Sequence, residues 1–173
     1  MIFLKKKTII LVILALVIVV LVKNKSDNLI IPKEALRIRI VSNSNDEFDI
    51  KKKQEIKEDV EKEVYKLLKG VNNIDEARNI INDNLDKLNV VIEEKTSDYN
   101  ISFGNNYFPQ KTYKGIVYDE GIYESLVITL GEGSGDNWWC VLFPPLCLLE
   151  GNEETKDVEY QFFVKELLDK YFD

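Results

Sequence analysis

The chain has 173 residues, of which 31% are charged, with a net charge of −7 and no histidine. A chain of this length accommodates one domain of ordinary size and a short additional segment. The absence of histidine excludes Ser-His-Asp and Cys-His catalysis and all histidine-containing metal sites, and two cysteines are too few for a four-thiolate zinc site. Carboxylate chemistry and a lysine activated by burial remain possible for catalysis, but neither has a recognisable signature in this sequence. We therefore expect no metal, no cofactor and no enzymatic activity.

The amino-terminal segment combines basic charge with an apolar run. Lysines at positions 5–7 precede residues 9–22, which include no polar side chain. This order is typical of a secretory leader, and a run that is apolar on every side is atypical of a core helix. The run is shorter than the roughly 20 apolar residues of a membrane span, and residues 21–26 lack the small residues of a cleavage site. A cleaved signal peptide and a retained signal anchor both remain open for residues 1–23.

Export determines the organisation and charge of the remaining chain. Residues 24–31 are predicted to form a short polar tether, and Pro32 begins a single domain at residues 32–173. The positive-inside tendency places this domain outside the cytoplasm, with membrane contact through the leader if it is uncleaved. Residues 1–23 contain four lysines and no acids, so 23 minus 4 leaves 19 basic residues against 30 acidic ones, a net charge of −11. Such a body is repelled by phosphates, which argues against nucleic-acid binding.

The first predicted element of the body is a strand at Leu36–Val41. The alternation in LRIRIV places the apolar side chains on one face and Arg37 and Arg39 on the other. These arginines form a polar group with Asn43 and Ser44, which follow the strand. We interpret the group as a solvated strand face and a helix cap, and a second partner-binding surface is the alternative.

Two helices are predicted next. Over residues 49–69 apolar side chains recur at spacings of three and four, and Gly70 follows at a position that favours left-handed backbone. A second helix over residues 73–92 begins with the capping-box pair Asn73 and Glu76. Each helix has one apolar face, so both should pack on a sheet or on each other.

The second half of the body is rich in β-forming residues. Strands are predicted at residues 99–103, 113–118 and 123–130, and a helix is predicted at residues 157–172. This order predicts an α+β fold, in which a mostly antiparallel sheet packs with two long helices and a C-terminal helix.

The loop at residues 131–137, GEGSGDN, has three glycines at alternate positions. A phosphate-binding loop would carry a lysine after its glycines, whereas this loop carries Glu132 and Asp136. We interpret it as a connection whose backbone approaches another segment closely.

The segment at residues 138–149, WWCVLFPPLCLL, carries no charge. In an extended strand Trp138 and Trp139 would point to opposite sides, and both faces would be apolar. Pro144 and Pro145 cannot donate to a sheet, so pairing should end there. The pattern leaves three interpretations open: burial in the core, a face exposed to a partner, and contact with a membrane interface.

Both cysteines of the chain, Cys140 and Cys147, lie in this segment. Outside the cytoplasm such a pair is compatible with a small disulfide loop, which would stabilise the fold by roughly 2–3 kcal/mol on the entropy model. Two buried thiols are the alternative. We favour the disulfide.

Two stretches of the sequence carry a family resemblance. They are IPKEALRIRIVSNSN at residues 31–45 and GIYESLVITLGEGSGDNWWCVLFPPLC at residues 121–147. Together with the helices between them, they resemble stage II sporulation protein R. The resemblance covers about residues 31–150 in order and without large gaps, and GDNWWCVLFPPLC is too unusual for chance agreement.

The resemblance implies a specific role. Members of that family are made in the forespore of endospore-forming bacteria and exported into the space that faces the mother cell. They trigger a membrane-embedded aspartic protease, which then removes the pro-sequence of the sigma-E precursor. No catalytic residues are implied. The residues that match the family's motif, and that we expect to form the activating surface, are Trp138, Trp139, Cys140, Pro144, Pro145 and Cys147.

Two other classes of function are compatible with the sequence. A cell-wall enzyme would need two carboxylates, and 30 acidic residues make some close pair unavoidable. A structural adaptor anchored by its leader would hold a membrane complex together without switching it. Activation of a receptor is the function that the sequence favours.

Overall fold

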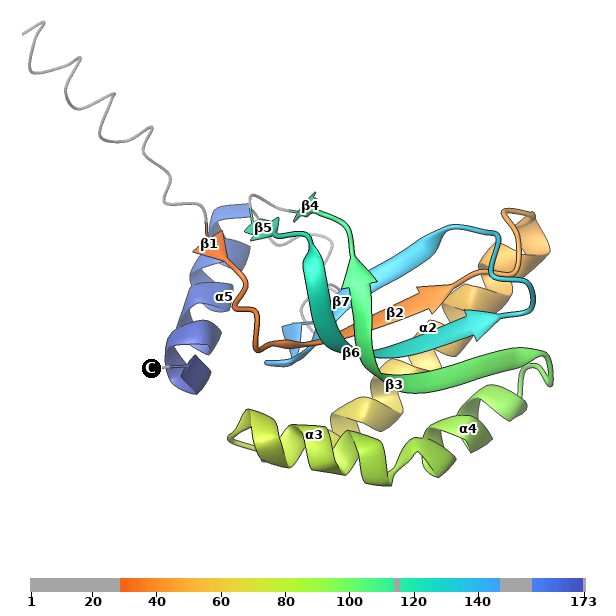
Figure 1. The fold of residues 1–173 in the computed structure, drawn as a ribbon, viewed down its shortest axis with the longest axis horizontal. Helices are drawn as coiled ribbons and strands as arrows, with labels where there is room; N and C mark the ends of the chain where they lie inside the picture. The colour runs from red at the N-terminus through yellow and green to blue at the C-terminus, as the bar shows by residue number, and fades with distance from the viewer. Residues whose placement is uncertain (1–28, 114–115, 147–156, 173) are drawn as a thin grey trace, which may run out of the picture.

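The computed structural model describes residues 29–113, 116–146 and 157–172 (Figure 1). The elements, in chain order, are β1 (Leu29–Ile30), β2 (Leu36–Val41), α2 (Glu47–Leu68), α3 (Ile74–Asp83), α4 (Leu85–Glu93), β3 (Tyr99–Phe108), β4 (Lys111–Tyr113), β5 (Ile116–Tyr118), β6 (Gly121–Leu130), β7 (Asn137–Phe143) and α5 (Asp157–Phe172). The predicted leader and most of the predicted tether lie outside the described residues. The end of the predicted tether forms β1, so this part of the tether is a strand. Within the described ranges, no helix has both the length and the apolar character needed to cross a membrane.

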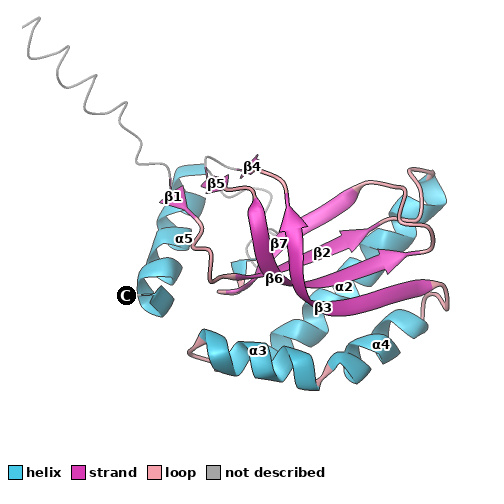
Figure 2. Cartoon of the chain, viewed as in Figure 1, coloured by secondary structure: helices cyan, strands magenta, loops and turns pink. Residues whose placement is uncertain are grey.

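A four-stranded mixed sheet forms the centre of the molecule, in the order β3-β6-β2-β7 (Figure 2). β2 is parallel to β6, whereas the pairs β2–β7 and β3–β6 are antiparallel. Helices α2, α3 and α4 cover one face of this sheet (Figure 1). The alternation in β2 places Leu36, Ile38 and Ile40 against these helices, where all three are buried. The structure confirms the predicted α+β class and the mostly antiparallel sheet.

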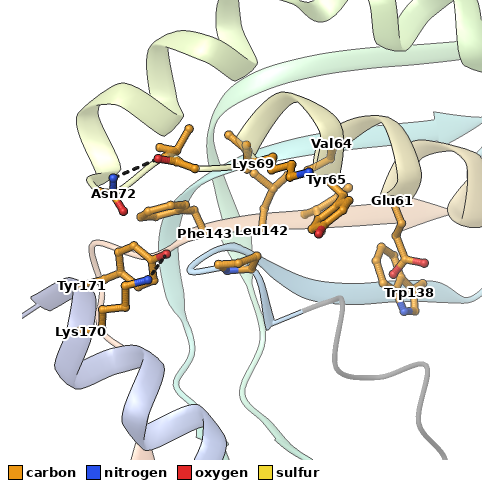
Figure 3. A pocket seen from close by; sticks show the side chains of 15 residues that line it. Glu61, Val64, Tyr65, Lys69, Asn72, Trp138, Leu142, Phe143, Lys170 and Tyr171 are labelled. Atoms are coloured by element: carbon orange, nitrogen blue, oxygen red, sulfur yellow. Dashed lines mark hydrogen bonds between the residues drawn. The ribbon is translucent and has the colours of Figure 1, made fainter.

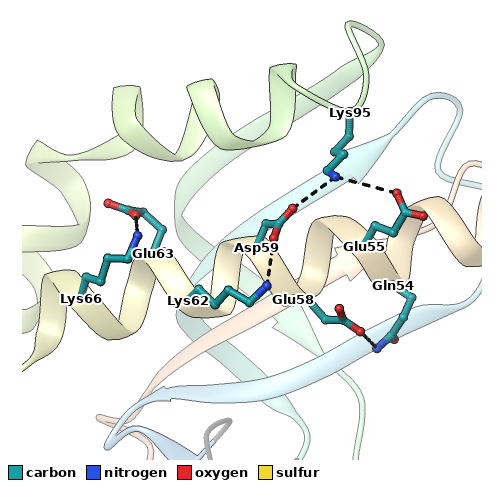
Figure 4. Close-up of polar contacts among 8 residues, drawn as sticks. All are labelled: Gln54, Glu55, Glu58, Asp59, Lys62, Glu63, Lys66 and Lys95. Carbon is teal, nitrogen blue, oxygen red and sulfur yellow. Dashed lines mark hydrogen bonds and ion pairs between the residues drawn. The ribbon is translucent and has the colours of Figure 1, made fainter.

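Helix α2 has one buried face and one charged face. Ile56 and Val60 lie on the same side because they are four residues apart, and both are completely buried in the main core. The outer face carries ion pairs, such as that between Lys66 and Glu63 at 2.9 Å (Figure 4). Gly70 follows the helix with a φ of 85°, as its position in the sequence predicts.

The second predicted helix, at residues 73–92, is two helices in the structure. Its beginning is confirmed, because the backbone N–H of Glu76 donates to Oδ1 of Asn73 at 2.8 Å. The helix breaks at Asn84, whose side-chain amide donates to the carbonyl of Ile80 at 2.7 Å. An asparagine that bonds to the preceding turn in this way competes with the helical ladder. The apolar periodicity continues through the break, so the sequence pattern does not reveal it.

The strands of the second half differ from the predicted ones in two ways. β3 continues to Phe108 instead of ending at residue 103, because residues 104–106 remain paired with β6 although they are polar or glycine. The strand predicted at residues 113–118 is an antiparallel pair, β4 and β5. This pair joins β1 in a separate sheet with the order β1-β5-β4.

A second and smaller core lies where this sheet, α5 and β7 meet. Its buried members are Ile31, Ala35, Ile116, Val141, Leu146, Val164 and Leu168. Val141 of β7 belongs to this cluster, whereas Cys140 and Leu142 belong to the main core. The latter part of β7 is therefore packed on both faces.

Candidate functional site

The charge-free segment begins as β7, an outer strand of the main sheet. It pairs with β2 so that Trp138 lies opposite Ile40 and Trp139 lies opposite Arg39. Paired residues share a face, so the two indoles point to opposite sides of the sheet, as the sequence predicts. Both indoles are half-buried, whereas residues 140–143 are buried. The segment therefore has a core part and an accessible part.

Trp138 lies beside a cavity of about 230 Å³ on the helix-covered side of the sheet (Figure 3). Side chains of α2, β7 and α5 line this cavity, which is the smaller of two beside the indoles. Nζ of Lys57 lies 4.9 Å from the Trp138 ring centroid and 4.0 Å from the carboxylate of Glu61. Burial raises the pKa of Glu61, and the neighbouring Lys57 offsets this effect only in part.

On the opposite side of the sheet, cationic and aromatic side chains contact one another. Phe108 packs edge-on against Trp139 with 4.9 Å between the ring centroids. The guanidinium of Arg39 lies 5.2 Å from the Trp139 centroid, and that of Arg37 lies 3.3 Å from the Tyr123 centroid. The Tyr123 hydroxyl donates to a backbone carbonyl at 2.9 Å, which fixes this ring. Cation–π contacts contribute about 0.5–2 kcal/mol each.

Arg37 is buried, so the predicted solvated strand face is wrong at this position. The residue is only 3% exposed, and burial lowers the pKa of its guanidinium. The alternation predicts which face carries Arg37, but it does not predict that Phe108 and Tyr123 from two other strands cover that face. Within the described part of the chain, Nε and Nη2 of Arg37 have no hydrogen-bond partner. A buried polar group without a partner costs about 1–3 kcal/mol.

Asn43 and Ser44 belong to a contact between two loops. Oδ1 of Asn43 accepts from the backbone N–H of Glu132 at 2.9 Å, and the Ser44 hydroxyl donates to Asp49 in the first turn of α2 at 2.7 Å. Gly135 packs so closely on Ser44 that a Cβ atom on residue 135 would overlap the carbonyl of Ser44. The glycine loop makes a close backbone contact, as predicted. The four residues of the predicted polar group do not form one continuous surface.

A larger cavity, of about 590 Å³, lies beside both indoles. Residues of β2, β7, β4 and the end of β3 line it, and α2 contributes Lys57. The charged side chains that line its described part are Arg37, Lys57 and Lys111, and all three are cationic. No cluster of acidic and cysteine side chains suited to a metal ion occurs in the described ranges.

The residues of the predicted activating surface differ in accessibility. Pro145 is half-buried and lines the smaller cavity together with Trp138. Pro144 and Cys140 are buried. Cys140 is disulfide-bonded, and Cys147 lies outside the described residues. Among the described members of the motif, the accessible ones are the two indoles and Pro145.

Phe108, Tyr123 and Lys57 also belong to this site, although no sequence pattern marks them as binding residues. They come from three elements, and long-range pairing brings them together; Phe108, for example, pairs with Gly121 at the far end of β6. The sequence signals were only the aromatic and cationic character of these residues. That character alone does not identify neighbours.

Comparison with known proteins gives the family. The profile of stage II sporulation protein R matches residues 32–153, which is more than half of the chain. The chain belongs to the stage II sporulation protein R family. Stage II sporulation protein R of Bacillus subtilis (strain 168) is 37% identical over 145 residues, which cover 79% of this chain and 65% of that protein. The match therefore extends over less than two thirds of the relative's length.

The stage II sporulation protein R match includes every described residue that lines the larger cavity. It does not include Lys170 and Tyr171 of α5, which line the smaller one. No solved structure matches the chain significantly. The resemblance drawn from the sequence is confirmed, and it places the chain among sporulation signalling proteins.

Proposed function

We propose that this protein is an exported signal that activates a membrane-embedded aspartic protease, so that the sigma-E precursor is processed in the mother cell. The observation that carries the proposal is the pair of half-buried indoles on β7, each beside a cavity. Tryptophan is enriched among the residues that dominate binding energy at protein–protein interfaces. An outer strand also offers backbone groups with which an extended partner segment can pair.

The energetics of such a switch are within reach of this surface. A ligand activates a receptor only if it binds the active state more tightly than the inactive state. Moving a receptor from mostly inactive to mostly active requires a difference of about 5.5 kcal/mol. A hot-spot residue contributes about 2–4 kcal/mol, so Trp138 and Trp139 together can supply most of this difference.

Export into the space between forespore and mother cell is part of the same proposal. It is supported by the lysines at positions 5–7 and the apolar run at residues 9–22. A retained leader would also give membrane contact, whereas a cleaved leader would release the protein. No nucleic-acid partner is proposed for a body of this negative charge.

No second function is favoured by a specific observation. A cell-wall hydrolase would need two carboxylates facing one site. Among the described residues lining the two larger cavities, Glu61 is the single carboxylate, and it lines only the smaller of them. Asp49 and Asp98 line a third cavity, but its volume of about 60 Å³ is far below that of a ligand site. A structural adaptor would bind the same receptor without changing its activity, so the experiment on activity separates it from an activator.

The test is co-expression of the full chain with the receptor protease and the sigma-E precursor in a host that lacks the family. We expect the precursor to be shortened only when all three proteins are present. If the receptor binds the chain but precursor processing does not change, the chain is an adaptor and the proposal is wrong.

A further inference from the structure

The larger cavity is cationic in a protein with a net charge of −7. Arg37, Lys57 and Lys111 contribute positive charge to its described walls, and no described acidic residue lines it. The carboxylate that pairs with Lys57 at 4.0 Å, that of Glu61, lines the smaller cavity. A concave site lined by one sign of charge concentrates ligands of the opposite sign. The charge of the walls therefore points to an anionic ligand.

The geometry of the Arg37 guanidinium indicates which kind of anion would bind. Its Nε and Nη2 lie on one edge of the guanidinium plane and lack hydrogen-bond partners in the described part of the chain. Two parallel N–H donors on one edge match the two oxygens of a carboxylate, which they bind in a bidentate manner. The residue is 3% exposed, and buried charges are normally paired. Burial lowers the pKa of Arg37 and the distant Asp119 carboxylate opposes this effect, but no described carboxylate forms an ion pair with the guanidinium within 4.0 Å.

Aromatic rings hold the arginine and form the rest of the binding surface. The Tyr123 centroid lies 3.3 Å and the Phe108 centroid 5.5 Å from the guanidinium carbon of Arg37. The Nε and Nη2 atoms are buried, so a ligand in the cavity that Arg37 lines reaches them when the side chain turns toward it. Phe108 and Trp139 also line the cavity and offer apolar surface to groups beside the carboxylate.

We propose that the larger cavity binds the side-chain carboxylate of an acidic residue in an extended segment of a partner polypeptide, with Arg37 as the bidentate donor. Phe108 and Trp139 contact the residues that flank the carboxylate, and the exposed Lys111 adds attraction at the rim. The identity of the polypeptide as the receptor protease rests on the proposed function. The carboxylate chemistry of the cavity does not.

The test uses the full exported chain, labelled with nitrogen-15, and two tripeptides. The probes are acetyl-Tyr-Glu-Leu-amide and acetyl-Tyr-Gln-Leu-amide, which differ by one carboxylate, and inorganic phosphate at matched ionic strength is the third ligand. The readout is the Nε–Hε resonance of Arg37, assigned by its loss in Arg37→Lys. We expect a saturable downfield shift with the Glu peptide and binding about tenfold weaker with the Gln peptide. An equal response to both peptides, no response to the Glu peptide, or the same shift with phosphate would overturn the proposal.

Variants connect the shift to the geometry. Arg37→Lys keeps the charge but loses the bidentate edge, and should weaken binding of the Glu peptide about tenfold. Arg78→Lys is the matched control, because Arg78 pairs with Glu124 at 2.6 Å outside the cavity, and it should bind like the parent. Lys111→Gln removes an exposed cation, so it tests the site even if Arg37→Lys is unfolded. We expect it to reduce the affinity for the Glu peptide about twofold or more. Parent-like binding by Lys111→Gln and by any folded Arg37→Lys would contradict the proposal.

Failure of this inference and failure of the proposed function give different results. A protein that binds the Glu peptide but leaves the sigma-E precursor unprocessed retains the carboxylate site and loses the role as activator. A protein that drives processing but does not distinguish the two peptides retains the role as activator and loses the carboxylate site.

Discussion

Gly135 shows how closely the loop at residues 131–137 packs on the end of β2. A Cβ atom at this position would lie 2.8 Å from the Cβ of Ser42 and would also overlap the carbonyl of Ser44. We predict that Gly135→Ala lowers the free energy of unfolding by about 1–3 kcal/mol, as overpacking usually does. A Cβ atom on residue 104 in β3 would have no atom within 4 Å, so there is space for a methyl group. Gly104→Ala should therefore be neutral or stabilising by about 0.5 kcal/mol. Urea unfolding measures both, and equal effects of the two substitutions would show that the loop contact is loose.

Glu61 gives the molecule a defined dependence on pH. Burial makes the pKa of this carboxyl higher in the folded chain than in the unfolded chain, so its ionisation opposes folding. At a pH below the unfolded-state pKa the carboxyl is protonated in both states, and it carries no penalty. We therefore predict that Glu61→Gln becomes more stable than the parent as pH rises through the unfolded-state pKa. The difference should become constant above the folded-state pKa.

Urea unfolding of the parent and Glu61→Gln between about pH 3 and pH 7 measures this difference. A difference that stays constant over the range, or that favours the parent at neutral pH, would contradict the effect assigned to burial.

At single positions, the sequence predicted alternation well and burial poorly. The face assigned to Arg37, the opposite orientations of Trp138 and Trp139, and the cap at Asn73 follow from local periodicity and backbone chemistry. The burial of Arg37 depends on Phe108, which is far away in sequence. Local patterns do not specify such contacts, because they arise from the pairing of distant strands.

At the scale of elements, the strong periodic segments were predicted closely. The strand at Leu36–Val41 and the helix at Asp157–Phe172 have the predicted bounds, and α2 begins two residues before the predicted position. The break at Asn84 was missed because the apolar stripe continues through it. The small sheet was missed because β1 and β5 are short and pair over a long distance in the chain. Short elements of this kind are determined by tertiary contacts rather than by their own residues.

Helix α2 allows a direct comparison of its two faces. Ile56 is completely buried, and we predict that Ile56→Ala lowers the free energy of unfolding by about 2–5 kcal/mol, as in other cores. Lys66 and Glu63 form an ion pair at 2.9 Å, but the Lys66 side chain is 70% exposed. Lys66→Ala should therefore change the free energy of unfolding by only about 0.5 kcal/mol or less. Chemical denaturation of both variants checks the prediction. Comparable losses would mean that the charged face contributes to stability as much as the core does.

At the scale of the whole molecule, export predicts the state of the cysteines. Cys140 is disulfide-bonded in the structure, and the chain contains two cysteines. We predict that the exported protein takes up no alkylating reagent before reduction and two equivalents after reduction, as measured by intact mass. Two adducts on the unreduced protein would favour free thiols. The same mass shows whether residues 1–23 have been removed, which separates a released signal from an anchored one.

The proposed function requires that the two indoles on β7 engage the receptor. Trp138 and Trp139 are half-buried, so serine at both positions removes interface surface while the buried residues 140–143 remain. Phe48 is 70% exposed on α2 and lines neither cavity, so Phe48→Ser is a matched control for loss of an aromatic side chain.

The decisive measurement is processing of the sigma-E precursor by the co-expressed receptor in the presence of the Trp138→Ser/Trp139→Ser double variant, with its folding verified by thermal unfolding. We predict that processing falls about tenfold or more, whereas Phe48→Ser remains at the level of the parent. Processing at the parental level by a folded double variant would contradict the claim.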